Sequence, residues 1–323
     1  MEVALNDADN SEEDEQVVEG DCQGLGAPVM PVHNMSASHK KDREVVQQDA
    51  MTWLCESDEP FDGSIFTGIP DMLDVHETCS KARRKAVGAL QLAMEYKEWF
   101  RACAMRLFSR LAVGQCAVFS QTDSRVVQEE GGRVVEWLDK CHLLCSVAEE
   151  VAGVQLLWHK IALDSAAAPC SHRPGFTHVL CFGKQFSFKV SAFLTPDVLD
   201  RGRMTWLKAT GLEVCLLGVL FLRHVVGAPL VLNPFCGHGT ILAVANYFGM
   251  PARGVEVLPK RCRRSRSLDL RGVLDRVPLE TFCRLGLPPS ALPPPQPPAS
   301  GQPGCLQPQC PSVSQQLLEE QHR

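Results

Sequence analysis

The sequence lacks the features that mark secreted, disulfide-rich and membrane proteins. None of its 15 cysteines forms a C-x-x-C pair, and no segment resembling a signal peptide opens the chain. We therefore expect reduced thiols in an intracellular protein, cytoplasmic or nuclear. The longest apolar run, Val214 to Leu222, ends at Arg223, well short of the roughly 20 residues that a membrane span requires. We expect a soluble protein without a membrane segment.

Basic residues are absent from the first 20 positions, which hold eight acids and predict a solvated tail. Without these acids the net charge of −6 becomes +2, so the remainder carries no charge excess that demands nucleic acid. Ten of the 22 prolines fall between Pro288 and Pro311. A proline-rich tail can bind SH3-like protein partners, although a solvated tail is the commoner outcome. We expect disordered tails at 1–42 and 276–323, around one domain at 43–275.

The glycine-rich segment Val231-Leu232-Asn233-Pro234-Phe235-Cys236-Gly237-His238-Gly239-Thr240 is the most informative motif. It follows two apolar residues and precedes a helical pattern, and Gly254-Val255-Glu256 comes one helix length later, as in a nucleotide-binding βαβ unit. Gly237 and Gly239 allow close approach of a ligand to the backbone, and Thr240 can cap the helix. Glu256 is placed to accept hydrogen bonds from a ribose. No Gly-Lys-Ser/Thr follows the glycines, which excludes a P-loop.

Short apolar runs alternate with helical patterns along the chain, which predicts a mainly parallel sheet covered by helices on both faces. The fold class is therefore α/β. Expected strands are 44–47, 64–67, 116–120, 155–161, 177–182, 229–233 and 253–257. Expected helices begin after Asp49, a candidate N-cap, and cover 91–111, 140–152, 205–226 and 241–248, with a basic helix from Lys260.

Three other groups of residues leave alternatives open. Cys141, His142 and Cys145 have a helical spacing that can hold a metal, but without a second ligand pair we favour a half-buried helix face and predict no metal site. His159 and His178 lie on expected strands, where a core histidine is the commoner finding; His178 is the better functional candidate. Two basic clusters can contact phosphate or be solvated; their members are Lys81, Arg83 and Arg84, and Lys260, Arg261, Arg263, Arg264 and Arg266.

The glycine segment resembles the D-P-F-x-G-x-G-T motif of S-adenosylmethionine-dependent methyltransferases, especially those that act on nucleic-acid amino groups. Its position late in the chain resembles the permuted DNA-modifying enzymes, in which the catalytic strand precedes the cofactor motif. A poorly characterised group of permuted methyltransferases is more similar still. Its segments have ordered counterparts here, over about residues 44–270, in Thr67-Gly68-Ile69-Pro70-Asp71, Ser120-Gln121-Thr122-Asp123, Trp137-Leu138-Asp139-Lys140, Leu156-Leu157-Trp158-His159-Lys160-Ile161, Arg173-Pro174-Gly175-Phe176-Thr177-His178 and Met204-Thr205-Trp206.

The resemblance implies a Rossmann-like, circularly permuted fold with S-adenosyl-L-methionine as cofactor. It implies that Glu256 binds the ribose and that Asp49 lies near the adenine. The residues it assigns to the cofactor are Asp49, Thr67, Gly68, Asn233, Pro234, Phe235, Cys236, Gly237, His238, Gly239, Thr240 and Glu256. Asn233 replaces the usual aspartate, but its amide oxygen can still accept a hydrogen bond.

The catalytic candidates are Pro70, Asp71 and His178. In the amino-methylating enzymes a leading polar side chain and a proline carbonyl hold the target amine, and an aromatic ring stacks on the flipped base. This chain has Gly68 and Asp71 where those enzymes have the polar and aromatic residues. Asp71 can orient or deprotonate a nucleophile, or it can cap a turn.

The resemblance therefore implies a methyltransferase with an unidentified acceptor, of which nucleic acid, RNA or DNA, is slightly favoured. The alternative is a catalytically silent, cofactor-binding protein that acts through partners recruited by its tails.

Overall fold

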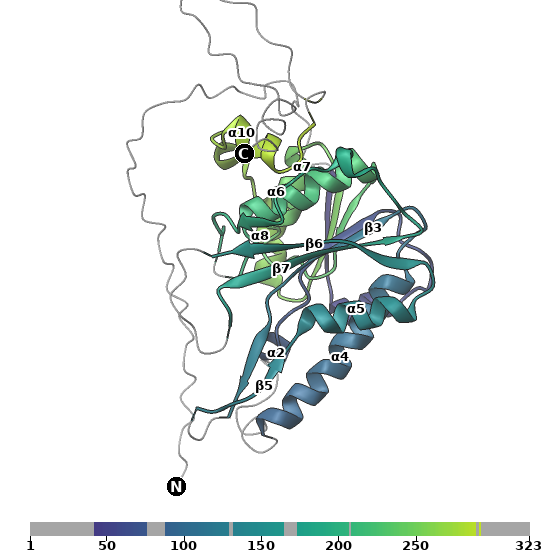
Figure 1. Ribbon diagram of the computed structural model, residues 1–323, viewed down its shortest axis with the longest axis vertical. Helices are drawn as coiled ribbons and strands as arrows, with labels where there is room; N and C mark the ends of the chain where they lie inside the picture. The colour runs from purple at the N-terminus through teal and green to yellow at the C-terminus, as the bar shows by residue number, and fades with distance from the viewer. Residues whose placement is uncertain are drawn as a thin grey trace, which may run out of the picture.

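A large sheet with helices on both faces forms the centre of the computed structural model, which describes residues 42–75, 88–128, 132–164, 173–206, 208–288 and 291 (Figure 1). Its strands are β1 (Arg43–Gln47), β2 (Ser64–Thr67), β3 (Cys116–Gln121), β6 (Val154–Leu163), β7 (Phe176–Lys184), β8 (Val198–Asp200), β9 (Val231–Asn233) and β10 (Ala252–Glu256). A separate hairpin pairs β4 (Ser124–Val127) with β5 (Val134–Leu138).

The helices are α1 (Ala50–Cys55), α2 (Met72–Val75), α4 (Ala89–Ser109), α5 (Lys140–Glu150), α6 (Leu212–Phe221), α7 (Thr240–Tyr247), α8 (Pro259–Ser267), α9 (Arg271–Leu274) and α10 (Leu279–Arg284). A 3-10 turn, η2 (Val190–Ala192), precedes β8, and a π-helical turn, η3 (Leu222–Val226), continues α6. Within the described residues no helix is long and apolar enough to cross a membrane.

The strands follow the order β1-β10-β9-β2-β3-β7-β6-β8 across the sheet. The first five are parallel to one another, whereas β7 is antiparallel to both β3 and β6. The strand that leads into the glycine turn, β9, is late in the chain but lies beside β2 in the middle of the sheet. The carboxyl ends of β1, β10, β9, β2 and β3 therefore meet at one edge, where open parallel sheets bind ligands.

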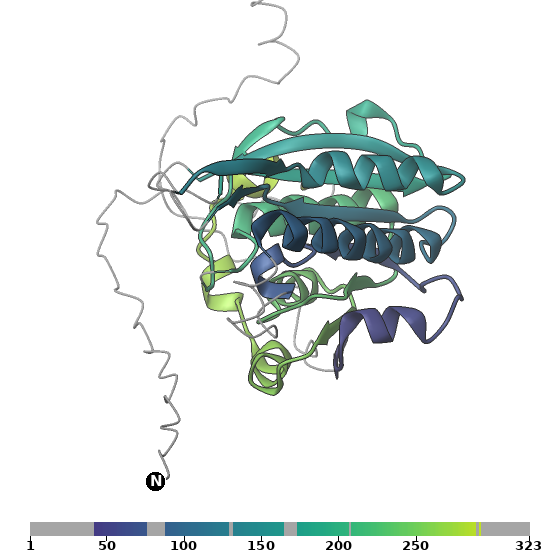
Figure 2. The same ribbon diagram turned by 90° about the horizontal axis from the view of Figure 1, so that it is seen from below.

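Each face of the sheet has its own apolar core. One core holds residues of α6, α7 and α8, and the other holds residues of α1, α4 and α5. Figure 2 shows α1 in purple, α4 in blue and α5 in teal together on the near face. Side chains alternate between the two cores along each central strand, so Ile65 packs with α4 whereas Phe66 packs with α6. This alternation explains why β2 is buried along its whole length.

All seven expected strands are present, and the mainly parallel α/β fold is confirmed. The sequence analysis missed the β4–β5 hairpin and the edge strand β8. The helix expected from residue 205 begins only at Leu212, because Gly211 lies against Arg201, where a Cβ would come 2.0 Å from the Arg201 carbonyl oxygen. The residues before it form a loop instead.

The folded region continues past the expected boundary at residue 275. Phe282 of α10 is buried and its ring packs edge-on against Phe248, with the centroids 5.9 Å apart. Leu285 is also buried in the same core. The expected boundary fell before α10 because this helix has only six residues, too few for a clear helical periodicity. The rest of the two expected tails, 1–41, 289–290 and 292–323, lies outside the described residues, as do Lys81, Arg83 and Arg84.

Gly218 fixes the distance between α6 and the sheet. A Cβ at this position would lie 2.4 Å from Cε1 of Phe66. We expect Gly218→Ala to lower the free energy of unfolding by about 1–3 kcal/mol, because overpacking a tight core forces side chains off their rotamers. Gly272→Ala in α9 is the matched control, since nothing lies within 4 Å of its added Cβ. Urea denaturation of both variants measures the difference; equal stability would contradict the packing argument.

Candidate active site

The glycine turn lies between β9 and α7. Gly237 and Gly239 adopt φ values of 53° and 84°, in the left-handed region. A Cβ at Gly239 would lie 2.3 Å from Oγ of Ser265 in α8, so this glycine also permits close packing of two helices. Thr240 does not cap α7, contrary to expectation: the N-cap is Gly239, and the Thr240 hydroxyl shares a 2.6 Å hydrogen bond with Thr205. The left-handed turn places Thr240 already inside the helix.

Two acidic side chains lie beside this turn, one at the end of the next strand, β10, and one after the strand beyond it, β1. Glu256 is the last residue of β10, and Gln47 of β1 lies opposite it in register. The Glu256 carboxylate is buried and accepts a 2.8 Å hydrogen bond from the Leu258 amide, which fixes its orientation. Asp49 follows β1 and caps α1 by accepting a 2.8 Å hydrogen bond from the Thr52 amide, as expected from the sequence. Both carboxylates lie at the same sheet edge as the glycines.

A cavity of about 180 Å³ opens over the carboxyl ends of β9, β2 and β3. The predicted site residues that line it are Gly68, Pro70, Asp71, Asn233, Phe235, Cys236, Gly237 and Thr240. Those that do not line it are Asp49, Thr67, His178, Pro234, His238, Gly239 and Glu256. The segments that follow β9 and β2 thus line one cavity. Asp49 and Glu256, at the ends of β1 and β10, lie to one side of it.

Asn233 joins the glycine turn to the catalytic strand. Its Oδ1 accepts a 2.8 Å hydrogen bond from the Thr67 hydroxyl and a 3.2 Å hydrogen bond from the Phe235 amide. An amide oxygen has two lone pairs. The oxygen that the sequence analysis assigned to the cofactor is therefore already engaged by β2 and by the turn itself.

Trp206 covers the glycine turn. Its ring stacks on His238 with centroids 4.2 Å apart, and its Cζ2 atom lies 3.0 Å from where a Cβ on Gly237 would be. The Arg261 guanidinium of α8 lies 5.3 Å from the centre of the indole, within cation–π range. Trp206 thereby forms one wall of the cavity.

The carbonyl of Pro70 already accepts one hydrogen bond within the protein. It accepts a 2.8 Å hydrogen bond from the hydroxyl of Tyr96, a fully buried residue of α4. Burial, together with the Asp71 carboxylate, raises the pKa of Tyr96, so the phenol remains a donor. At Gly68 an added Cβ would lie 2.9 Å from the Ser120 carbonyl oxygen. The backbone therefore leaves little room for the polar side chain that amino-methylating enzymes carry there.

Asp71 forms ion pairs with two cations, the Lys140 ammonium and the Arg173 guanidinium. The Lys140 side chain is 0% exposed, and its ammonium also donates to the Thr122 carbonyl at 2.6 Å. Burial lowers the pKa of Lys140, while the Asp71 charge opposes that shift. The structure thus ties the carboxylate that the sequence analysis considered as a base into a buried ion pair.

Asp123 is the centre of a second part of this network. Its Oδ1 accepts a 2.9 Å hydrogen bond from the Lys140 backbone amide, and its Oδ2 accepts a 3.0 Å hydrogen bond from Trp137 Nε1. His178 Nε2 lies 3.3 Å from the same Oδ2. Burial tends to raise the pKa of Asp123, but the hydrogen bonds from His178, Lys140 and Trp137 outweigh it, and the pKa is lowered. The carboxylate is therefore held in its ionised form.

His178 reaches this network from β7 and does not line the cavity. Its Nδ1 lies 2.9 Å from Nε2 of His159 on β6. Burial and the neighbouring His178 both lower the pKa of His159, which favours its neutral form. His178 therefore has partners on both ring nitrogens, Asp123 and His159.

Sequence reasoning missed Tyr96, Asp123, Lys140 and Trp206 as site residues. Three of them lie in segments that carried the family resemblance, which was the available signal. No sequence signal pointed to Tyr96, because it lies within a helix whose pattern is only amphipathic.

The ion pair between Lys140 and Asp71 gives a testable stability effect. We expect Lys140→Met to lower the free energy of unfolding by about 1–3 kcal/mol, because it leaves the Thr122 carbonyl without its donor, while Asp71 keeps Arg173 as a partner. The control is Lys97→Met, which removes a partner of Glu136 in a pair whose side chains are 32% and 28% exposed; about 1 kcal/mol or less is expected there. Chemical denaturation compares the two, and a smaller loss for Lys140→Met than for Lys97→Met would refute the buried-pair account.

Solved structures with the same fold include two proteins related to DNA methylation. A proposed DNA modification methylase from Thermus thermophilus, complexed with S-adenosyl-L-methionine, has a TM-score of 0.51 at 16% identity and covers 76% of this chain and 94% of its own. The PvuII DNA methyltransferase, specific for cytosine N4, has a TM-score of 0.51 at 16% identity and covers 76% of this chain and 91% of its own. Comparisons with protein-family models and with curated proteins gave no match. The chain has the Rossmann-like fold of these methyltransferases.

Proposed function

We propose that this protein is an S-adenosyl-L-methionine-dependent methyltransferase with a permuted strand order and a nucleic-acid acceptor. The observation that carries the proposal is the glycine turn after β9, flanked by Glu256 and Asp49 on the next two strand ends and open to the cavity beside it. The strand order supports the permutation, since the strand leading to the glycine turn is central in the sheet but ninth in the chain.

The residues at this edge fit the parts of the cofactor. Glu256 is held by the Leu258 amide so that its carboxylate can accept from ribose hydroxyls, and Asp49 lies one strand further out, on the adenine side. The glycine turn lets the backbone approach the ligand, and Phe235 and Cys236 line the cavity where the methionine end would lie. The bound cofactor supplies an electrophilic methyl group. The protein then has to align a nucleophile with that group and manage one proton.

In this protein the acceptor is bound differently from the amine in D/N/S-P-P-Y enzymes, which is held by a polar side chain and a proline carbonyl. Tyr96 donates a hydrogen bond to the Pro70 carbonyl, and Lys140 and Arg173 neutralise the charge of Asp71. We therefore propose that Pro70 and Asp71 shape the acceptor site without holding an amine, and that His178 supports this network through Asp123.

Nucleic acid is the favoured acceptor because DNA methylation is the activity named for the two solved proteins described above. The cations that line the cavity, Arg173, Arg201 and Lys208, pair with Asp71, Asp164 and Asp74 respectively. The lining therefore carries no cation excess of its own.

A catalytically silent, cofactor-binding protein is the second candidate, with partners recruited through the tails. The ion pairs of Asp71 favour it, because they hold the carboxylate away from the role of a free base. Both candidate functions use the same cofactor site. They differ only in whether the methyl group is transferred.

Calorimetry with S-adenosyl-L-methionine tests the cofactor site. We expect the full chain to bind, and Glu256→Gln to weaken binding by about tenfold, because a charged hydrogen-bond acceptor is worth about 1.5–3 kcal/mol. Glu44→Gln, on the exposed side of β1, should bind as the unchanged protein does. No binding at millimolar cofactor, or equal loss in both variants, would refute the proposed site.

Methyl transfer distinguishes the two candidates. Extract from cells that lack the protein is incubated with the purified chain and cofactor labelled in the methyl group. We expect label that nuclease digestion releases and protease digestion does not. Label that only protease releases would refute the nucleic-acid acceptor, and cofactor binding without any label would leave the silent protein as the better account.

A further inference from the structure

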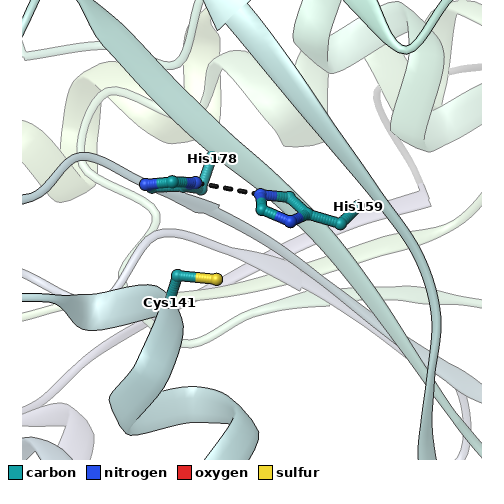
Figure 3. Close-up of side chains that lie close together, drawn as sticks. All are labelled: Cys141, His159 and His178. Carbon is teal, nitrogen blue, oxygen red and sulfur yellow. Dashed lines mark hydrogen bonds between the residues drawn. The ribbon is translucent and has the colours of Figure 1, made fainter.

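Three side chains with metal-binding atoms meet on the face of the sheet that α5 covers. Cys141 comes from the first turn of α5, His159 from β6 and His178 from β7. Their ligand atoms all lie within 4.8 Å of one another. Figure 3 shows the two imidazole rings side by side, with the Cys141 thiol beneath them.

The strand register explains how the two histidines meet. His159 lies opposite Leu180, and His178 lies opposite Ile161, so the histidines are diagonal neighbours on the same face of an antiparallel pair. The first turn of α5 is anchored beside them, because its N-cap Asp139 accepts from the His142 amide and Asp123 accepts from the Lys140 amide. The three positions are thus fixed by regular structure.

We propose that Cys141, His159 and His178 form a site for Zn²⁺, with solvent at the fourth position. One thiolate and two imidazoles are ligands that zinc prefers, and three protein ligands with one open position are a common zinc arrangement. The open position is on the solvent side, since His159 is exposed.

The distances suit tetrahedral zinc after a small adjustment. With zinc–nitrogen and zinc–sulfur bonds of about 2.0–2.1 and 2.3 Å, tetrahedral ligand atoms lie about 3.4 Å apart for two nitrogens and about 3.6 Å apart for nitrogen and sulfur. The facing nitrogens of His159 and His178 are 2.9 Å apart and need to separate by about 0.5 Å. The sulfur lies within 4.8 Å of them and therefore needs to approach by about 1.2 Å at most, which a rotation of its side chain supplies.

Asp123 provides the outer partner that zinc-bound histidines commonly have. Its Oδ2 lies 3.3 Å from His178 Nε2, so the proton sits on Nε2 and the Nδ1 lone pair faces His159. Carboxylate–histidine–zinc arrangements fix the ring and its tautomer in this way. On binding, His159 exchanges its proton through solvent from Nε2 to Nδ1 and stays neutral, while Cys141 loses its thiol proton, so one proton is released for each ion bound.

A metal ion bound at this site would link α5 to β6 and β7. The link would lie next to the network of ion pairs and hydrogen bonds that borders the cavity. Asp123 contacts both His178 and the backbone of Lys140, which in turn pairs with Asp71. A bound ion would therefore stabilise the arrangement of the acceptor side without touching the acceptor. This role does not depend on the proposed methyl transfer.

Co²⁺ is the probe for the test, because tetrahedral cobalt with a thiolate ligand gives visible d–d bands and a near-ultraviolet charge-transfer band. The full chain, treated with chelator and then dialysed, is titrated with Co²⁺ and afterwards with Zn²⁺. We expect one Co²⁺ per chain with both kinds of band, displacement by Zn²⁺, and a rise in the melting temperature with Zn²⁺.

Variants separate this site from other thiols and histidines. Cys141→Ser should remove the charge-transfer band, His159→Ala should weaken Co²⁺ binding at least tenfold, and Asp123→Asn should weaken it about 10- to 100-fold. His142→Ala, beside Cys141 but outside the cluster, should bind as the unchanged protein does. Far-ultraviolet circular dichroism checks that His159→Ala is folded. Absence of the charge-transfer band in the unchanged protein, its persistence in Cys141→Ser, or equal losses in His142→Ala and His159→Ala would overturn the proposal.

Discussion

The buried ammonium of Lys140 is the constraint on which the candidate active site depends. A buried charge is costly unless it is paired and hydrogen-bonded, and the ammonium finds its partners on two different segments, Asp71 after β2 and Thr122 after β3. The next residue, Asp123, holds the backbone amide of Lys140 at the start of α5. These segments satisfy the charge only in one relative arrangement. The same arrangement brings Arg173 to Asp71 and His178 to Asp123.

This network divides the sheet edge into two chemically different halves. Over β1, β10 and β9 the structure offers glycines and carboxylates, which suit a nucleoside with free hydroxyls. Over β2, β3 and β7 the polar groups are engaged with one another, from Tyr96 on Pro70 to the ion pairs of Asp71. We therefore interpret the first half as the proposed cofactor side, and the second as a rigid wall against which an acceptor would lie. Asp71 acts in this interpretation mainly through position, and a general base would have to come from elsewhere, including the acceptor itself.

The sequence predicted the parts of the fold that local signals encode. The apolar runs at β2, β3 and β7 and the cap at Asp49 were recognised because burial and capping leave short, regular patterns. The hairpin β4–β5 carried no such pattern, since its second strand is largely exposed. The start of α6 was misjudged because the steric limit at Gly211 comes from Arg201, a residue outside the helix. Phe282 is likewise buried by distant residues of the sheet's other helices.

The candidate site was predictable only where one segment contains it. The glycine turn, Glu256 and Asp49 stay predictions from short motifs, whereas the network around Lys140 joins residues far apart in the chain. The histidines show the same limit: Cys141 lacked a second ligand pair in its own helix, and the partners lie on two strands whose register brings them to it. Motif segments marked these residues without giving their contacts.

A crystal structure of the full chain with S-adenosyl-L-homocysteine, the product that remains after methyl transfer, tests the central claim most directly. The account predicts the ribose on Glu256, the adenine near Asp49, and the homocysteine chain at Phe235 and Cys236, with the sulfur directed into the cavity beside Pro70. A ligand bound elsewhere, or a glycine turn that stays closed beneath Trp206 with no ligand bound at saturating concentration, would contradict it.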